Sequence, residues 1–474
     1  MPKFQKDLTT GSVSKHLILF ALPFLASNFL QALYNMSDMF FVGRFNGAVG
    51  ATAVGVGGQV TFLVLNLISG LAVGGTVLIA QFIGASVSSG AAGHDDVKRT
   101  VGTIFTLYGA AAIALTVVML AADRFILRLL VTDPLAYPET LKYTNICMAG
   151  LIFIFGYNAV SAVLRGMGDS KHPLLFVAIA AVLNIVLDAL FCGPFGWGAA
   201  GAAWATVISQ GVSFLLSVWF LRKKEFLFDF HPKSFRIDKD IARQLLRVGL
   251  PTSIGGTTVS FSFITLTGVA NSIAGIVGTT ALSIAGKVNS VAILPGFAMQ
   301  AAVSSMAGQN LGARKHDRAL KTCLTAIVIT LCVTVPLLFL VRAFAAPITR
   351  FFLGTETGGL DQAVALACVE QAAVYIRSIS WDYIFVAGTF NIIGLALAAG
   401  HTRFTLSMSL FSSIVARVPA AWLLGKTLGL GLAGMGFAAP IATALSLVVD
   451  VIYLCGGRWK KSRVMEHLEL TMEG

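Results

Sequence analysis

The chain has 474 residues, of which 56% are hydrophobic and 12% charged, and its formal net charge is +12. Soluble domains typically contain about 25% charged residues, so this composition excludes an ordinary soluble protein and indicates a polytopic membrane protein. The positive charge is more simply explained by the orientation of membrane segments than by nucleic acid, which we do not expect as a partner.

About twelve apolar segments follow one another along the chain, and each reaches the length of about 20 residues that a helix needs to span a bilayer. None shows the alternation typical of a strand, so we expect an all-α fold with twelve transmembrane helices. The expected spans are residues 16–43, 52–83, 98–121, 138–163, 172–195, 198–221, 244–271, 280–308, 319–341, 367–398, 403–425 and 431–456.

Basic residues predict the orientation of these spans. If both termini lie inside, the inner segments hold 24 of the 34 Lys and Arg residues and the outer segments hold 7, while Lys287, Arg377 and Arg417 fall within spans. Because inner loops of membrane proteins are enriched in Lys and Arg, we expect both termini in the cytoplasm of a multi-pass protein of the plasma (cell inner) membrane.

The two halves of the chain repeat each other. Matching pairs of residues are separated by 228 positions in four places, and by 232 and 233 positions further on. The pairs are Pro23 and Pro251, Gly50 and Gly278, Gln81 and Gln309, Gly84 and Gly312, Gly168 and Gly400, and Gly201 and Gly434. Six spans per copy give the two copies the same orientation, a transporter architecture in which the substrate path lies between the halves.

A charged, proline-containing connection lies between the copies and is typical of a linker. We therefore expect an N-terminal six-helix lobe at residues 1–221, a cytoplasmic linker at 222–243, and a C-terminal six-helix lobe with a short cytoplasmic tail at 244–474.

Only four of the 22 acidic residues fall well inside the expected spans: Asp38, Asp188, Asp382 and Asp450. A carboxylate at mid-membrane costs roughly 2.5 to 3.5 kcal/mol on insertion scales, so such a residue is expected to face protein or a water-filled cavity and to be functional.

The first span combines one of these acids with a proline. Tyr34 and Asn35 precede Asp38 by one turn, so the three side chains are expected to share a helix face that resembles a cavity wall. Pro23 lacks a backbone donor and is expected to be a bend point. A helix-end position for Asp38, in contact with headgroup water, is the simpler alternative.

The fifth span holds the second acid, Asp188, with Asn184 one turn before it. Asn158 and Thr206 add an amide and a hydroxyl in the flanking spans. Together with Asp38 these groups offer hard oxygen ligands for a cation such as Na⁺. Alternatively, burial and mutual repulsion of two nearby carboxylates would favour binding of a proton. Helix association without transport is the structural alternative.

Polar residues in the second half are harder to assign. Asp382 lies five residues after Arg377, so a salt bridge is as reasonable as an ion site, and Lys287 or Arg417 could also pair with it or line the cavity. Asp450 is within two turns of the basic residues that follow the last span, so a snorkelling or paired structural role is favoured.

With these motifs in view, the chain resembles the multidrug and toxic compound extrusion (MATE) transporters over essentially its whole length. The similarity runs from ALPFLASNFLQALYNMSDMFFVG through the paired QFIGA and GQNLGA motifs and RGMGDSK to GLAGMGFA. It implies two six-helix lobes that form a V-shaped cavity, and export of cationic or amphipathic drug-like compounds by a monomer in exchange for H⁺ or Na⁺, without another cofactor.

The resemblance also implies site residues. Family members with a first-lobe ion site have acids in helices one and five, asparagines in helices four and five, and a threonine in helix six. The matching residues here are Asp38, Asn158, Asn184, Asp188 and Thr206, with Tyr34 and Pro23 at a neighbouring tyrosine and at the helix-one bend point.

One departure concerns the second lobe. The branch with acidic coupling residues in helices seven and ten has a glutamate after its Leu-Pro motif, whereas Leu250 and Pro251 are followed here by TSIGGTTVSF. Asp382 also falls about one turn earlier than the repeat alignment requires. The chain therefore looks more like the branch coupled through its N-terminal lobe.

We accordingly predict an ion-coupled antiporter in which occupancy of the first-lobe site bends helix one at Pro23, closes the substrate pocket and lets the lobes alternate access. A flippase for lipid-linked oligosaccharides or peptidoglycan precursors, from the same larger group, is the main alternative. A membrane enzyme is disfavoured because the sequence has neither H-E-x-x-H nor a His/Cys grouping, and a passive channel is disfavoured by the duplication.

Overall fold

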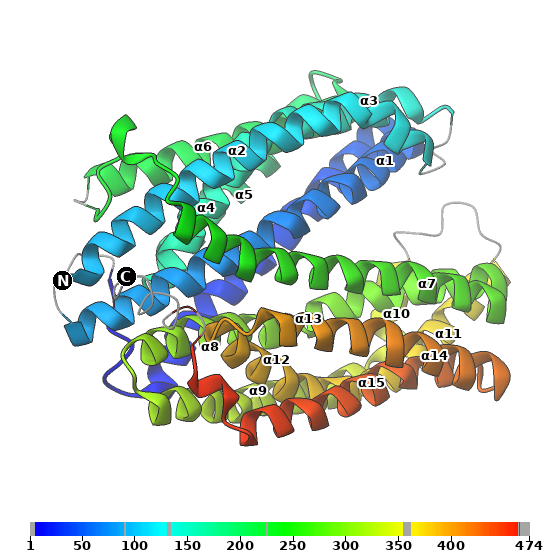
Figure 1. Cartoon of the computed structure of the whole chain (residues 1–474). Helices are drawn as coiled ribbons and strands as arrows, with labels where there is room; N and C mark the ends of the chain where they lie inside the picture. The colour runs from blue at the N-terminus through cyan, green and yellow to red at the C-terminus, as the bar shows by residue number, and fades with distance from the viewer. Residues whose placement is uncertain are drawn as a thin grey trace. The chain divides into compact units, whose positions relative to one another are not determined.

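The computed structural model describes residues 5–89, 92–129, 134–223, 226–353, 362–462 and 464, and every regular element within these ranges is a helix (Figure 1). The expected all-α fold is therefore confirmed. Linker residues 224–225 and most of the expected C-terminal tail lie outside the described residues.

The helices are numbered along the chain as in Figure 1. They are α1 (Val13–Ser89), α2 (Ala92–Leu129), α3 (Tyr137–Ala149), α4 (Leu151–Gly166), α5 (Lys171–Cys192), α6 (Gly198–Lys223), α7 (Lys239–Ala292), α8 (Leu294–Gly312), α9 (His316–Ala343), α10 (Ala345–Leu353), α11 (Gln362–Ile379), α12 (Asp382–Ala398), α13 (Thr402–Leu410), α14 (Arg417–Trp422) and α15 (Gly431–Cys455). Short 3-10 turns η1 (Pro232–Ser234) and η4 (Arg458–Lys460) and two π-helical segments, η2 (Phe411–Ala416) and η3 (Leu423–Thr427), complete the set.

Helix lengths agree with membrane spans. Nine helices in the described part are long and apolar enough to cross a bilayer, and two helix pairs bent by 46° and 49° bring the number to eleven. The 54-residue α7 is interrupted at Ala274 and Gly275, and its second part is followed directly by α8. Dividing α7 at this break accounts for the twelve expected spans.

Glycine makes two of the breaks inside long helices. Gly47 in α1 has φ 65° and Gly275 in α7 has φ 55°, and an added Cβ would meet nothing within 4 Å at either position. Positive φ values are strained for residues with a side chain but not for glycine. Each glycine therefore ends one span and starts the next without an intervening loop.

The chain divides into two compact units. Unit 1 comprises Met1–Thr10 and Leu22–Ser253, and unit 2 comprises Gly11–Ala21 and Ile254–Gly474. Within unit 1, α6 packs against α3, α4 and α5, and α2 packs against α3 and α4. The lobe boundaries expected from the sequence, residues 1–221 and 244–474, remain a prediction, because this division is based on packing within each unit.

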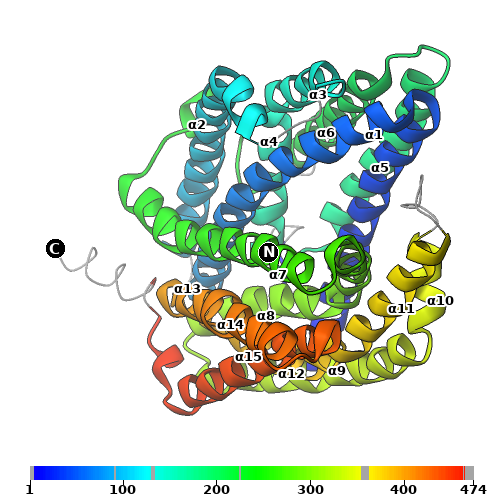
Figure 2. The same cartoon turned by 90° about the vertical axis from the view of Figure 1, so that its right-hand side faces the viewer.

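Unit 2 is built around α12, which packs against α8, α9 and α15, while α11 also packs against α15 (Figure 2). Its core is made of small and aliphatic side chains such as Ala285, Ala372 and Leu432, which are almost completely buried. Small residues let helix backbones approach closely, which is the usual way helices associate in a bilayer.

Candidate functional site

A buried carboxylate lies at the centre of the candidate site in unit 1. Asp38 lies in the first helical part of α1, more than two turns before the break at Gly47, and only 3% of its surface is exposed. This burial argues against the alternative of a helix-end acid in contact with headgroup water. A buried charge is costly unless it is hydrogen-bonded or paired, so the partners of Asp38 define the site.

Two side chains from neighbouring helices donate hydrogen bonds to Asp38. The Asn184 amide Nδ2 on α5 lies 3.1 Å from Asp38 Oδ1, and the Thr206 hydroxyl on α6 lies 3.1 Å from Asp38 Oδ2. Asn184 Nδ2 also lies 3.4 Å from Thr206 Oγ1. The structure thus joins three of the five predicted ligands in one network across three helices.

The second acid is next to this network but is not hydrogen-bonded within it. Asp188 lies one turn after Asn184 on α5 and has no exposed surface, and it interacts electrostatically with Asp38 and lies near Ser37. Within the part of the chain that the structure describes, neither Asp188 oxygen has a hydrogen-bond partner. Two carboxylates therefore share one buried region, and no Lys, Arg or His is among the described side chains that interact with either of them.

The cluster has more acceptors than donors. Both Asp188 oxygens and Asn184 Oδ1 are buried without a partner, while every donor of the network is already directed at Asp38 or Thr206. Buried polar atoms without a partner are rare in native proteins and call for an explanation such as a bound ion. Carboxylate, amide and hydroxyl oxygens are suitable ligands for a hard cation, and the same carboxylates can take up a proton.

The predicted cavity or gating residues on α1 are in different environments. Tyr34 is half-buried and lies near Asp38 and Gln210, whereas Asn35 is exposed. Tyr34 and Asp38 therefore share a face, and Asn35 lies outside it. The helix continues through Pro23 with helical backbone angles, and the Ser27 hydroxyl donates to the Pro23 carbonyl at 2.8 Å.

Asn158 is the predicted ligand whose side chain is directed away from the other four. Its amide donates to the Ile154 carbonyl, one turn earlier on α4, at 2.8 Å. Within the described ranges no hydrogen bond connects it to Asp38, Asn184 or Thr206.

Sequence reasoning missed Gln210, which is almost completely buried on α6 and lies near Tyr34. Its position one turn after Thr206 was the available signal, because residues four apart share a helix face.

In unit 2 the polar residues are arranged differently. Asp382, at the start of α12, faces Arg417 at the start of α14, with Oδ2 and an Nη atom 3.8 Å apart, and both side chains are largely buried. The partner is thus Arg417, one of the two alternatives considered, and not Arg377, whose side chain is exposed. Lys287 is half-buried in the second part of α7.

The predicted snorkelling or paired role of Asp450 is wrong. Asp450 on α15 has no exposed surface, lies near Thr389 and Cys323, and its oxygens have no hydrogen-bond partner among the described residues. None of the described basic residues that follow α15 in the sequence forms an ion pair with it.

These observations define a polytopic α-helical membrane protein with an uncompensated acidic cluster inside one helix unit, the arrangement expected of a transporter that binds an ion within the bilayer.

Comparisons with known proteins agree with this class. The family model MatE matches residues 23–190 and 251–423, and the chain belongs to this family of membrane transporters, whose members are not enzymes. The "Probable multidrug resistance protein YpnP" of Bacillus subtilis is 30% identical over 464 residues, which cover 97% of this chain and 98% of the relative.

Two solved structures are similar over almost their whole length. A MOP superfamily transporter from Pyrococcus furiosus has a TM-score of 0.87 and 25% identity, covering 97% of this chain and 98% of that one. The outward-facing conformation of a multidrug resistance MATE family transporter has the same TM-score and identity, with coverage of 98% and 100%.

Proposed function

We propose that the chain is a secondary active multidrug efflux transporter that exchanges cationic or amphipathic compounds for H⁺ or Na⁺. We further propose that coupling takes place in the N-terminal lobe at Asp38 and Asp188, in a monomer with both termini in the cytoplasm. Relatives that carry multidrug resistance names support the substrate class, and the acidic cluster of unit 1 supports the ion coupling.

The observation that carries the proposal is the surplus of buried acceptors around Asp38. Three unpartnered oxygens on Asn184 and Asp188, next to a second carboxylate, form a region that a positive ion would stabilise. Removing an ion from such a region restores the repulsion between the two acids, so occupancy and conformation are linked.

Either ion fits the chemistry of the site. A proton on one carboxyl would turn it into a donor for the other carboxylate, which removes both the repulsion and the shortage of donors. A Na⁺ ion would instead take ligands from Asp38, Asp188, Asn184 and Thr206. Asn158 would join this set only after its amide leaves the Ile154 carbonyl.

We assign the conformational response to α1. Asp38 and Tyr34 lie C-terminal to Pro23 on the same helix, and proline removes one hydrogen bond from the turn that contains it. The helix can therefore bend at Pro23 at lower cost than elsewhere. A bend there would move Asp38 and Tyr34 together, which links ion occupancy to the shape of a substrate pocket that these residues border.

Transport in inverted vesicles tests the proposal. Efflux of ethidium or norfloxacin would be measured under an imposed pH gradient or an imposed Na⁺ gradient, for the native chain and for Asp38→Asn and Asp188→Asn. We expect one gradient to drive efflux and both variants to lose this dependence. Asp95→Asn is the matched control, since it makes the same chemical change at an exposed acid.

Efflux that is independent of both gradients would contradict the proposal. Gradient-driven efflux in both variants at the native rate would contradict it as well. The flippase alternative is not favoured, because it needs several basic side chains for a pyrophosphate, and of the two second-half candidates, Arg417 and Lys287, Arg417 already faces Asp382. Complementation of a flippase-depleted strain would distinguish the two.

A further inference from the structure

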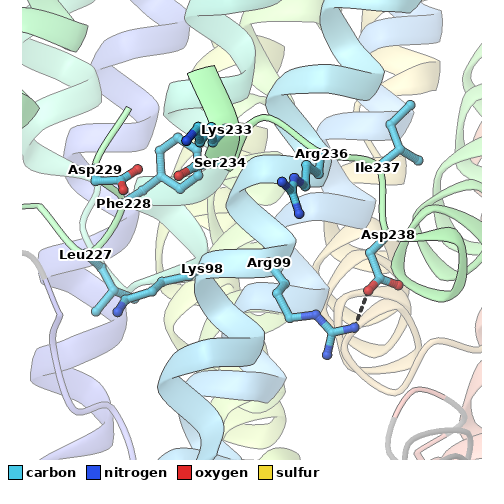
Figure 3. A pocket seen from close by; sticks show the side chains of 10 residues that line it. All are labelled: Lys98, Arg99, Leu227, Phe228, Asp229, Lys233, Ser234, Arg236, Ile237 and Asp238. Atoms are coloured by element: carbon cyan, nitrogen blue, oxygen red, sulfur yellow. Dashed lines mark hydrogen bonds and ion pairs between the residues drawn. The ribbon is translucent and has the colours of Figure 1, made fainter. Parts of the chain in front are cut away.

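A cavity in unit 1 is lined by residues that do not belong to the acidic cluster. It has a volume of about 480 Å³ and is formed between the first turns of α2 and the segment from Leu227 to Asp238 that precedes α7 (Figure 3). Its volume is within the range of about 300 to 1,000 Å³ typical of small-ligand sites. Neither the family match nor the transport proposal assigns a role to this segment.

Hydrogen bonds and a close backbone contact attach the segment to α2. The Asp238 amide donates to the Thr103 hydroxyl at 3.1 Å, and the Arg99 guanidinium is paired with the Asp238 carboxylate (Figure 3). A Cβ at Gly102 would lie only 2.4 Å from the Ser234 carbonyl oxygen. Gly102 is therefore the residue that lets the segment lie directly on the helix.

A cluster of aromatic side chains, of which Phe228 lines the cavity, packs the segment against α2. Phe105 on α2 contacts Phe228, Phe230 and Phe235 of the segment, with ring centroids 5.7 to 6.2 Å apart. Such pairs each contribute about 0.5 to 1.5 kcal/mol beyond their buried area. The segment is thus packed as a small aromatic core, and it is more than a connection between two halves.

The charges in the cavity are unbalanced. Lys98 and Arg99 from α2 and Lys233 and Arg236 from the segment line it, against two carboxylates. Lys98 and Arg99 have acidic partners in the first turns of α2, and Arg99 also pairs with Asp238. Lys233 and Arg236 have no ion-pair partner among the described residues.

The acids of the cavity are already engaged. One Asp238 oxygen accepts the amides of Asp240 and Ile241 at the start of α7, at 3.0 and 3.2 Å. Asp229 accepts the His231 amide at 3.1 Å, and hydrogen bonds from the Ser234 side chain and from this amide lower the pKa of Asp229. The carboxylates therefore organise the segment and leave the positive charge of Lys233 and Arg236 available.

We propose that this cavity binds a phosphate group, with Lys233 and Arg236 as its main ligands, and that the group belongs to an anionic phospholipid headgroup. The cavity lies at the polar end of α2, where the apolar span Asp95–Arg128 begins. Phe235 and Ile237 beside it are exposed apolar side chains suited to the lipid interface. Basic pockets at such positions recognise anionic headgroups.

The test uses the purified full chain in a neutral detergent. Its thermal midpoint would be followed during titration with phosphatidylglycerol, phosphatidylcholine or inorganic phosphate at constant ionic strength, since a ligand that binds the folded state raises the midpoint. The pocket variant is the double substitution Lys233→Gln and Arg236→Gln.

The control variant is Lys239→Gln with Arg243→Gln, which removes the same two residue types from exposed positions at the start of α7, outside the cavity. Arg243 has only an exposed ion pair with Asp240 at 4.0 Å, so its loss should cost little stability.

We expect phosphatidylglycerol to bind the native chain and the control variant, and to bind the pocket variant about 25-fold more weakly, given about fivefold per basic residue near an anionic surface. Phosphatidylcholine should bind weakly to all three. The same pattern with inorganic phosphate would support the phosphate site but assign it to a soluble ligand.

Equal losses in the pocket and control variants would show a general effect of charge and overturn the proposal, as would the absence of any shift in the native chain. Asp229→Asn gives an independent check because it removes a negative charge from the cavity and keeps all four basic residues. It should tighten phosphatidylglycerol binding by about threefold, and unchanged or weaker binding would contradict the site.

Discussion

In unit 1 the buried carboxylate of Asp38 interacts with a second carboxylate, that of Asp188, whereas in unit 2 the buried carboxylate of Asp382 faces the guanidinium of Arg417. The first region has a surplus of negative charge and of acceptors, and the second carries its own counterion. An acid that is paired with a basic side chain of the same chain gains little from binding an ion from solution. An uncompensated pair of acids is stabilised by such an ion.

The comparison also explains why one unit is the better candidate for coupling although both contain buried acids. Asp450 in unit 2 is uncompensated as well, but it is a single carboxylate, and the described residues nearest to it supply a hydroxyl and a thiol. Among the described residues, unit 1 joins an acid, an amide and a hydroxyl from three helices in one network and places a second acid beside it.

The largest expected effect is on the stability of unit 2. Arg417→Met leaves Asp382 buried without its counterion, and breaking a buried pair in this way costs about 3 to 5 kcal/mol. We expect a strongly lowered thermal midpoint in detergent, measured by size-exclusion chromatography after heating. The double variant Arg417→Met with Asp382→Asn should recover most of the loss, and a single variant as stable as the native chain would show that the pair is not a counterion pair.

The next effect is on the affinity for the coupling ion. Asp38→Asn removes a charge from the cluster and should weaken the apparent affinity for the ion that drives efflux by about 100-fold, or about 2.7 kcal/mol. Asp382→Asn should change it by less than about threefold in the protein that remains folded. Equal effects of the two substitutions on ion dependence would break the distinction between the two units.

Asp169, at the turn between α4 and α5, is an acid of unit 1 whose charge is balanced by basic side chains. It pairs with Lys6 at 3.6 Å and with His172, and it accepts the Lys171 amide at 3.0 Å. Burial alone would raise the pKa of Asp169, but the hydrogen bond with His172 and the charge of Lys6 outweigh it, and the pKa lies below its usual range.

Asp169→Asn should therefore lower stability by about 1.5 to 3 kcal/mol at neutral pH, without altering ion dependence. Because the folded-state pKa is lowered, the ionised Asp169 stabilises the fold above the unfolded-state pKa of about 4, and this contribution is lost as the pH falls through the folded-state value. The midpoints of the native chain and the variant should converge below pH of about 4, and a constant difference would contradict this account.

The smallest effect distinguishes the two asparagines. Asn184→Ala removes a donor to Asp38 and should weaken the apparent ion affinity by about fivefold, the worth of one hydrogen bond of about 1 kcal/mol. Asn158→Ala removes only a bond to its own helix and should change the affinity by less than about twofold. The reverse order would show that Asn158 reaches the ion in another conformation.

The spans and much of the unit 1 network could be predicted from the sequence, because apolar length is read directly and residues four apart must share a helix face. Spacing places Asn184 beside Asp188, and the mid-span positions of Asp38 and Thr206 single them out, in agreement with the family resemblance. The Asn158 hydrogen bond was not predictable, since an amide at mid-helix can turn either to a neighbouring helix or to its own backbone.

Tertiary features account for the remaining differences. Asp450 is close in sequence to basic residues, but the rotation of α15 directs it towards Thr389, and helix rotation is set by packing that the linear sequence does not display. The segment after α6 was recognised only as a charged linker, because its aromatic contacts with Phe105 join residues more than a hundred positions apart.

The π-helical segments on either side of α14 give the second repeat a way to hold an extra residue. From Gly168 to Gly201 the first copy has one residue fewer than the second copy has from Gly400 to Gly434, and the second copy contains η2 and η3 in this interval. A π turn takes in one residue more than an α turn. One such turn is enough to hold the surplus residue without rotating the helix that follows it, so Arg417 can keep its direction towards Asp382 although the second copy is one residue longer.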